Sequence, residues 1–282
     1  MTSPVSSASA PRGGADADAR DHLLALNGAE ERLQIVLGRV DAPDAVRLAA
    51  VQEWVVPGRA MQLLTPSLDH MLRGLGLAPG RIGRIACVRG PGSFTGLRLV
   101  LASALGLAKA LDAPLAGIDN LPLLAQSAAP LLPERARLWC VTHARRAQVY
   151  VQGFDVCRGG GQADARPLGP PRALMQEDAA SAITTNTPAA CGPPYLLGTG
   201  VRRNAAFFAS ALPQAVVLPD TADIPHTATL LAVAHAASYA AAPIVPLYLR
   251  GSDAEENLAS IAAKQGIAPD EAKARLDALT AS

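Results

Sequence analysis

The sequence contains few charged residues and few aromatic ones. Charged residues make up 17% of the 282 residues and aromatic residues 4%, whereas half of the residues are apolar. The charged share lies below the roughly 25% of an average globular protein, and a chain this apolar excludes wholesale disorder. The 25 Lys and Arg nearly balance the 24 Asp and Glu, so net charge gives no indication of direct binding to nucleic acid.

Cysteine and histidine are scarce and widely spaced. The four cysteines form no C-x-x-C pair, so neither a zinc knuckle nor a redox dithiol is predicted. The five histidines show no H-x-x-x-H or H-E-x-x-H spacing, which argues against a metal site on a helix. We therefore expect no metal ligand in this set: Cys87, Cys140, Cys157, Cys191, His22, His70, His143, His226 and His235.

Long apolar runs are also absent. The two most apolar stretches, 97–111 and 230–245, fall short of the about 20 residues that cross a bilayer. Residues 1–21 are rich in Ser, Ala, Gly and Asp and contain no apolar segment, so they predict a disordered leader rather than a secretory signal. We therefore expect a cytoplasmic protein without membrane association.

The length suggests about two domains, and the pattern of the first half is regular. Strand-like runs at 23–27, 33–39 and 47–56 precede a helical apolar face that extends from Met61 to Leu75. Pro66 either bends this helix or lies in its first turn after Thr65. Two strand and helix pairs follow. The order βββαβαβα is predicted for a first lobe over residues 22–134.

The second half repeats this pattern in a degenerate form. Strands at 138–142 and 148–154 flank a hairpin, and the Gly-, Pro- and Arg-rich segment 158–172 is expected to be a surface loop or insertion. Short strands at 195–200 and 215–218 and a helix at 227–241 complete a shortened second lobe over residues 135–250. Residues 251–282 read as a charged C-terminal tail. Such a layout resembles the α/β fold of the actin-like ATPase (ASKHA) superfamily.

The most distinctive motif lies between a buried strand and a long helix, and reads Gly90-Pro91-Gly92-Ser93-Phe94-Thr95-Gly96-Leu97-Arg98. It resembles the signature of the TsaB (YeaZ-type) family, the partner subunit in bacterial synthesis of threonylcarbamoyladenosine in tRNA. Further similarity lies at 23–27, 144–150, 197–200 and 246–250, so the resemblance extends from about residue 23 to residue 250.

The resemblance implies a scaffold subunit that is not an enzyme on its own. It would bind the catalytic subunit TsaD and support transfer of the threonylcarbamoyl group to the adenosine beside the tRNA anticodon. The complex, which includes a TsaE-type ATPase, would use ATP and Mg²⁺, whereas this chain alone would bind no cofactor and contact tRNA only indirectly. Without TsaD, the same surface is expected to form a homodimer.

The glycine-rich loop permits two interpretations. Gly90, Gly92 and Gly96 allow close approach of the backbone, and free N–H groups near Ser93 and Thr95 could bind an anion or a nucleotide. Alternatively, the loop packs the strand against the helix, because the G-K-[ST] ending of a P-loop is missing. The two hydroxyl residues are expected to cap the helix, and no catalytic residue is predicted.

The end of the first strand bears on the alternative function, a stand-alone ATP-dependent transferase or kinase. ATP-using members of the superfamily hold hydrated Mg²⁺ near an Asp at this place, since Mg²⁺ prefers anionic or water oxygen ligands. Here the residue is Asn27, followed by Gly28. This departure, which also separates the chain from other TsaB relatives, argues against independent ATP hydrolysis.

Two apolar helical faces are candidates for partner binding. Either face could simply cover its own sheet, as in any α/β domain. In TsaB relatives, however, the corresponding helices pair with two helices of TsaD. The residues concerned are Met61, Leu64, Leu68, Met71, Leu75, Leu97, Leu101 and Leu105.

Overall fold

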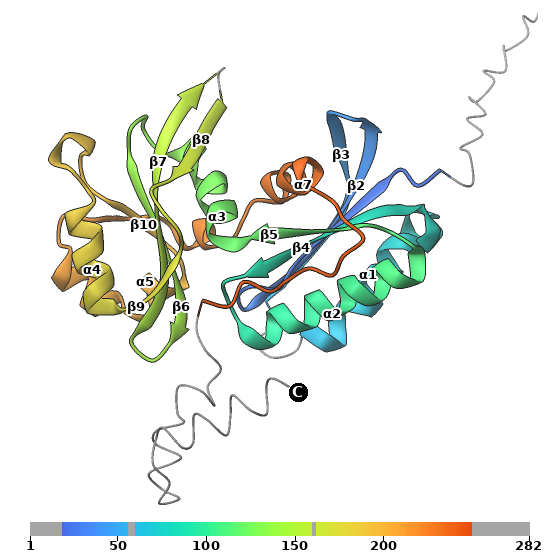
Figure 1. Ribbon diagram of the computed structural model, residues 1–282, viewed down its shortest axis with the longest axis horizontal. Coiled ribbons are helices and arrows are strands. Elements are labelled where there is room, and N and C mark those ends of the chain that lie inside the picture. The colour runs from blue at the N-terminus through green and yellow to red at the C-terminus, as the bar shows by residue number, and fades with distance from the viewer. Residues whose placement is uncertain (1–18, 56–59, 160–161, 250–282) are drawn as a thin grey trace, which may run out of the picture.

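The computed structural model describes residues 19–55, 60–159 and 162–249, which form two β-sheets with helices packed on their faces (Figure 1). All but the last three residues of the predicted leader lie outside this part of the chain, as does the whole predicted tail 251–282. Two halves follow one another along the chain, each built around one sheet.

The first sheet has the strand order β3-β2-β1-β4-β5. Its first three strands are antiparallel neighbours, and β4 and β5 run parallel to β1. The predicted order βββαβαβα is thus confirmed, and Pro66 lies inside the first helix. The elements are β1 (His22–Asn27), β2 (Arg32–Ala42), β3 (Ala45–Val55), α1 (Ala60–Gly74), η1 (Pro79–Arg81), β4 (Ile82–Gly90), α2 (Phe94–Leu111), β5 (Leu115–Asp119), α3 (Asn120–Ala128) and η2 (Ala129–Leu131).

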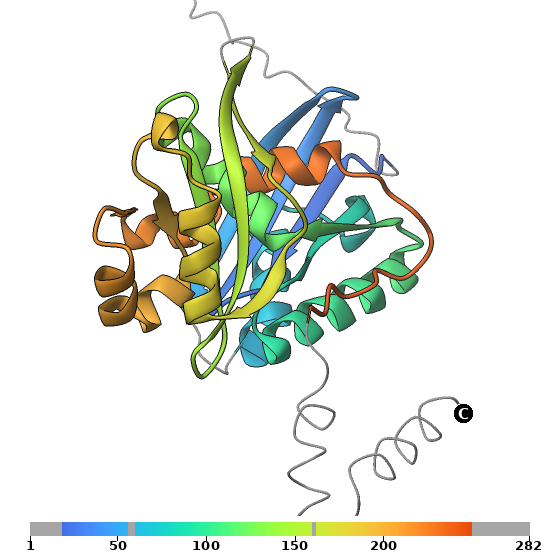
Figure 2. The same cartoon turned by 60° about the vertical axis from the view of Figure 1, so that its left-hand side comes forward.

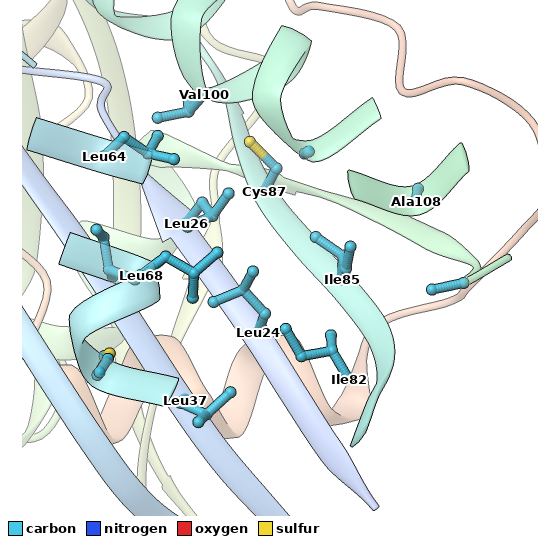
Figure 3. Close-up of a cluster of buried hydrophobic side chains, with 14 of the residues drawn as sticks. Leu24, Leu26, Leu37, Leu64, Leu68, Ile82, Ile85, Cys87, Val100 and Ala108 are labelled. Atoms are coloured by element: carbon cyan, nitrogen blue, oxygen red, sulfur yellow. The ribbon is translucent and has the colours of Figure 1, made fainter. Parts of the chain in front are cut away.

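Strand β1 is buried along its whole length, because both faces of the first sheet are covered. Leu24 and Leu26 point toward α1 and α2, where they meet Leu68 in one core cluster (Figure 3). Leu23 and Ala25 point to the opposite face and belong to a second cluster. The alternation follows from the two-residue period of a strand, and it explains why this strand reads as an unbroken apolar run.

The second sheet has the order β11-β10-β6-β7-β8, and β9 pairs with β7. The expectation of a surface loop over 158–172 is wrong, since β8 continues the sheet beside β7. Ala163 and Ala165 pack against the core of the second sheet. The Gly- and Arg-rich composition of the segment gave no sign of this burial. The elements are β6 (Arg137–Arg145), β7 (Gln148–Gly159), β8 (Gln162–Pro167), β9 (Arg172–Met175), α4 (Gln176–Thr185), η3 (Ala189–Cys191), β10 (Tyr195–Leu197), α5 (Thr199–Arg203), α6 (Ala205–Ala211), β11 (Val216–Val217) and η4 (Asp220–Asp223).

The last helix, α7 (Thr227–Ala236), returns to the first sheet (Figure 1). Its Leu230, Leu231 and Ala234 are buried against the β1 face that carries Leu23. The chain then runs past β5 and the end of β4, where Ala240 pairs with Leu115 and the N–H of Leu247 donates to the carbonyl of Arg89 at 2.8 Å (Figure 2). Helix α7 and the segment after it thus pack with the first half. The division into lobes over 22–134 and 135–250 stays a prediction.

Helix α2 is long and apolar enough to cross a membrane by length and composition. It spans 18 residues because it begins at Phe94, three residues before the apolar stretch seen in the sequence. In the fold it covers the first sheet, with Leu97, Val100 and Ala104 buried. An apolar helix is what a sheet face requires, so this position accounts for its composition.

Leu68 lies in the middle of the apolar stripe 61–75 and Leu75 at its end, and the two differ in burial, with 5% and 43% of their surface exposed. We expect Leu68→Ala to lower the free energy of unfolding by about 2–5 kcal/mol, because it leaves a cavity in the core. The matched change Leu75→Ala should cost less than about 1 kcal/mol. Urea unfolding followed by circular dichroism measures both values, and equal losses would contradict this assignment of the core.

Candidate functional site

The glycine-rich loop before α2 lies directly against the turn that follows β1. A Cβ atom on Gly92 would lie 2.1 Å from the carbonyl oxygen of Ala29, and one on Gly96 would lie 2.1 Å from that of Gly28. Real Cβ atoms do not approach an oxygen so closely. The N–H of Ser93 also donates to the carbonyl of Ala29. Glycine is therefore required at positions 92 and 96, because the backbone of the loop packs directly on the backbone of the turn after β1.

The start of α2 is capped by the side chain of Ser93. Ser93 is the N-cap, as predicted, and its Oγ accepts a hydrogen bond from the N–H of Gly96 at 3.4 Å. Thr95 lies exposed in the first turn, and Gly90 adopts a positive φ of 120°. Packing and capping give this loop a structural role. Binding of an anion or a nucleotide by Gly90, Gly92, Ser93, Thr95 and Gly96 stays a prediction.

Asn27 at the end of β1 is buried and engaged on both atoms of its amide. Its Nδ2 donates to Gln34 Oε1 at 2.8 Å, and its Oδ1 accepts from the N–H of Ala29 at 3.0 Å. Gln34 in turn donates to the carbonyl of Pro225 at 3.0 Å. The side chain therefore fixes the turn after β1 and ties it to the segment that precedes α7.

The same turn reaches across to the second half. The hydroxyl of Thr199 donates to Glu30 Oε2 at 2.8 Å, and Arg203 forms an ion pair with Glu31. Burial raises the pKa of Glu30 to about 8. We call this contact between the turn 28–31 and α5 the seam.

Asp223 organises the far side of the seam. Its Oδ1 accepts from the N–H of Gly198 at 2.6 Å, and its Oδ2 lies 2.9 Å from Arg202 Nε. Sequence reasoning missed Glu30 and Asp223 because neither belongs to a motif. The only signal nearby was the Gly198-Thr199-Gly200 run, which carried part of the family resemblance.

The predicted partner-binding residues do not share one environment. Four of them lie in the core: Leu64, Leu68, Met71 and Leu97. Two are half-buried, Leu101 and Leu105, and Leu75 is exposed. The side chain of Met61 lies outside the part of the chain that the structure describes. A role of these residues in partner binding stays a prediction. On this structure the accessible part of the set is Leu75, Leu101 and Leu105.

An exposed aromatic corner, which the sequence reasoning also missed, lies at the start of α2. Phe94 is 51% exposed, and the guanidinium of Arg98 lies 3.6 Å from its ring centroid. Tyr248 completes the corner, with its ring centroid 6.1 Å from that of Phe94. Exposed aromatic and arginine side chains are common where proteins meet, so the corner extends the accessible apolar surface of α2.

No group of three or more His, Cys, Asp or Glu that could hold a metal ion occurs within residues 19–55, 60–159 and 162–249.

Comparison with known proteins gives consistent matches. A family model described as tRNA N6-adenosine threonylcarbamoyltransferase (TsaD) matches residues 55–168. The tRNA threonylcarbamoyladenosine biosynthesis protein TsaB of Haemophilus influenzae is 37% identical over 87 residues, which cover 31% of this chain and 36% of that protein. The Bacillus subtilis protein of the same name is 32% identical over 94 residues, which cover 33% of this chain and 40% of that protein. The aligned parts thus span well under half the length of either relative.

Two further matches are longer. An uncharacterized protein of Mycobacterium tuberculosis (strain H37Rv) is 33% identical over 194 residues, which cover 68% of this chain and 75% of that protein. The structure of YeaZ from Pseudomonas aeruginosa superposes with a TM-score of 0.62 at 26% identity, over 81% of this chain and 100% of that one. Coverage of this extent includes both sheets, so the predicted α/β architecture is confirmed and is shared with YeaZ.

Gly96 and Gly106 offer a matched pair within α2, because a Cβ on Gly106 meets nothing within 4 Å. We expect Gly96→Ala to destabilise the protein by about 1–3 kcal/mol, since the added methyl group collides with the turn after β1. Gly106→Ala should instead stabilise it by up to about 1 kcal/mol, because alanine favours a helix. Thermal unfolding of both variants tests this, and a neutral Gly96→Ala would refute the close contact.

Proposed function

We propose a function from one premise, which is that the chain belongs to the TsaB (YeaZ) family. The chain takes part in the synthesis of threonylcarbamoyladenosine in tRNA, as a non-catalytic subunit. It binds a TsaD-type catalytic protein and is required for transfer of the threonylcarbamoyl group to the adenosine beside the anticodon.

One observation carries the non-catalytic part of the proposal. Asn27, at the end of β1, provides no carboxylate, and both atoms of its amide are already used to hold the turn. A carboxylate at this place would be an anionic oxygen ligand for Mg²⁺. ATP and Mg²⁺ are therefore assigned to the complex, together with a TsaE-type ATPase, rather than to this chain alone.

The accessible surface of α2 supports the partner part of the proposal. Leu101 and Leu105 are half-buried, and Phe94 stands exposed at the helix start. An apolar strip flanked by Arg98 and Lys109 suits a helical partner. The same strip would form a homodimer in the absence of TsaD, and tRNA contact would be made through the complex.

Reconstitution tests the function directly. The purified chain is combined with a TsaD-type protein, a TsaE-type ATPase, ATP, Mg²⁺, tRNA and threonylcarbamoyl-adenylate, and the modified nucleoside is measured by mass spectrometry. We expect modification to require both this chain and TsaD. Product formed by this chain alone, or formed fully without it, would overturn the proposal.

A single substitution tests the surface. Ala102 is exposed on α2 between Leu101 and Leu105, so Ala102→Arg places a large cation in the strip without disturbing the core. We expect the dissociation constant for the TsaD-type partner to rise at least about tenfold. The control is Ala209→Arg, which makes the same change at an exposed position of α6 and should leave affinity unchanged. Unaltered binding by Ala102→Arg would show that the partner uses another face.

A further inference from the structure

The seam joins two halves that are also held together elsewhere. Helix α3 buries Leu121 and Leu124 in the core of the second sheet, beside Leu138 and Phe154. The N–H of His226, just before α7, donates to the hydroxyl of Ser127 on α3 at 2.7 Å. The halves therefore stay connected through α3 even if the seam opens.

Glu30 makes the central contact of the seam with little support for a negative charge. Its Oε2 accepts one hydrogen bond, from the hydroxyl of Thr199, which itself accepts from the N–H of His143 at 3.0 Å. Its Oε1 is enclosed and has no hydrogen-bond partner among the described residues, although the rest of the side chain is partly accessible. A buried carboxylate normally needs several donors.

The charged groups around Glu30 do not supply the missing hydrogen-bond donors. Arg203, at the end of α5, is paired with Glu31 on the turn itself. Asp223 in η4 is a second nearby carboxylate, and it holds Arg202 and the N–H of Gly198. His143 faces the site from β6 through its backbone N–H. Burial raises the pKa of Glu30, Asp223 and Glu31 raise it further, and the Thr199 hydrogen bond and Arg203 lower it.

The turn that carries Glu30 is fixed to its own half. Gly92 and Gly96 lie in backbone contact with Ala29 and Gly28, and Asn27 bonds the N–H of Ala29. Repulsion at the seam would therefore move α5 and its sheet away from the turn, rather than unfold the turn. The Glu31–Arg203 pair is about half exposed on both sides, and an exposed ion pair contributes little to holding the seam closed.

We propose that Glu30 is a proton-operated latch between the two halves, docked on Thr199 as the neutral acid and released as the carboxylate. The latch does not depend on the proposed function. It depends on the placement of one carboxyl group between the turn after β1 and α5.

The direction of the effect follows from proton linkage. The docked state binds the proton more tightly, with a pKa of about 8, than an undocked Glu with the ordinary value of 4.5. Docking is therefore strongest at acid pH, weakens as pH rises from 4.5 toward 8, and changes little above that. Between pH 6 and pH 9 the equilibrium constant for opening should rise on the order of a hundredfold.

Hydrogen exchange of the full-length protein by NMR measures this opening. The reporters are the N–H groups of His143 and Gly198, which are bonded to Thr199 and Asp223 within the second half, next to the contact of Thr199 with Glu30. After correction for the intrinsic exchange rate, we expect their protection to fall steeply between pH 6 and pH 8. Amides in β1 should keep their protection, because the sheet itself does not open.

Two variants distinguish the effect of Glu30 on the pH dependence from that of its neighbour Glu31. Glu30→Gln has the same shape without a titrating group and should show protection that is independent of pH, whereas Glu31→Gln should keep the wild-type pH dependence. A Glu30→Gln variant with the wild-type pH profile would overturn the proposal.

A direct titration covers the case in which Glu30→Gln fails to fold. The side-chain carboxyl carbon of Glu30 in the wild-type protein, labelled with ¹³C, should titrate well above the ordinary range of Glu. Titration near 4.5, or seam protection that does not change with pH, would also overturn the latch.

Discussion

The contact on which the rest of the molecule depends is the packing of the loop 90–96 on the turn after β1. Two stretches of backbone touch there without side chains between them, and only glycine at positions 92 and 96 allows it. The contact brings the start of α2 to the end of β1 and holds the turn residues in place. Because Glu30 and Glu31 belong to that turn, the loop also determines where the first half meets the second.

In this arrangement, polar side chains hold the structure together at places where a nucleotide-binding site would need them free to contact its ligand. The amide of Asn27 closes the turn, Ser93 caps α2, and Asp223 bonds Arg202 and the backbone of Gly198. A subunit built this way is suited to hold a shape and offer a surface. The proposed division of labour, with chemistry on a partner, is consistent with that use of its polar groups.

The helices α1 and α2 illustrate how a core and the proposed partner surface can share one element. Their inner residues, among them Leu68 and Val100, fill the space above β1 (Figure 3). The surface proposed for a partner is the outer strip of α2 and its aromatic corner. Leu101 and Leu105, which are half-buried, lie between these two environments.

Much of the fold was determined by the sequence itself, because period and turn residues act locally. The order βββαβαβα, the Ser93 cap and the hairpin between β6 and β7 all follow from neighbours along the chain. Only the tertiary structure decided what depends on distant contacts. Strand β8 forms by pairing with β7. Helix α7 packs on the first sheet because it buries Leu23 and Ala25. Tertiary contacts also decide which residues of the apolar stripe are buried and which are accessible. Burial raises the pKa of Glu30, and Asp223, far along the chain, raises it further. No local pattern carries information about such an enclosure.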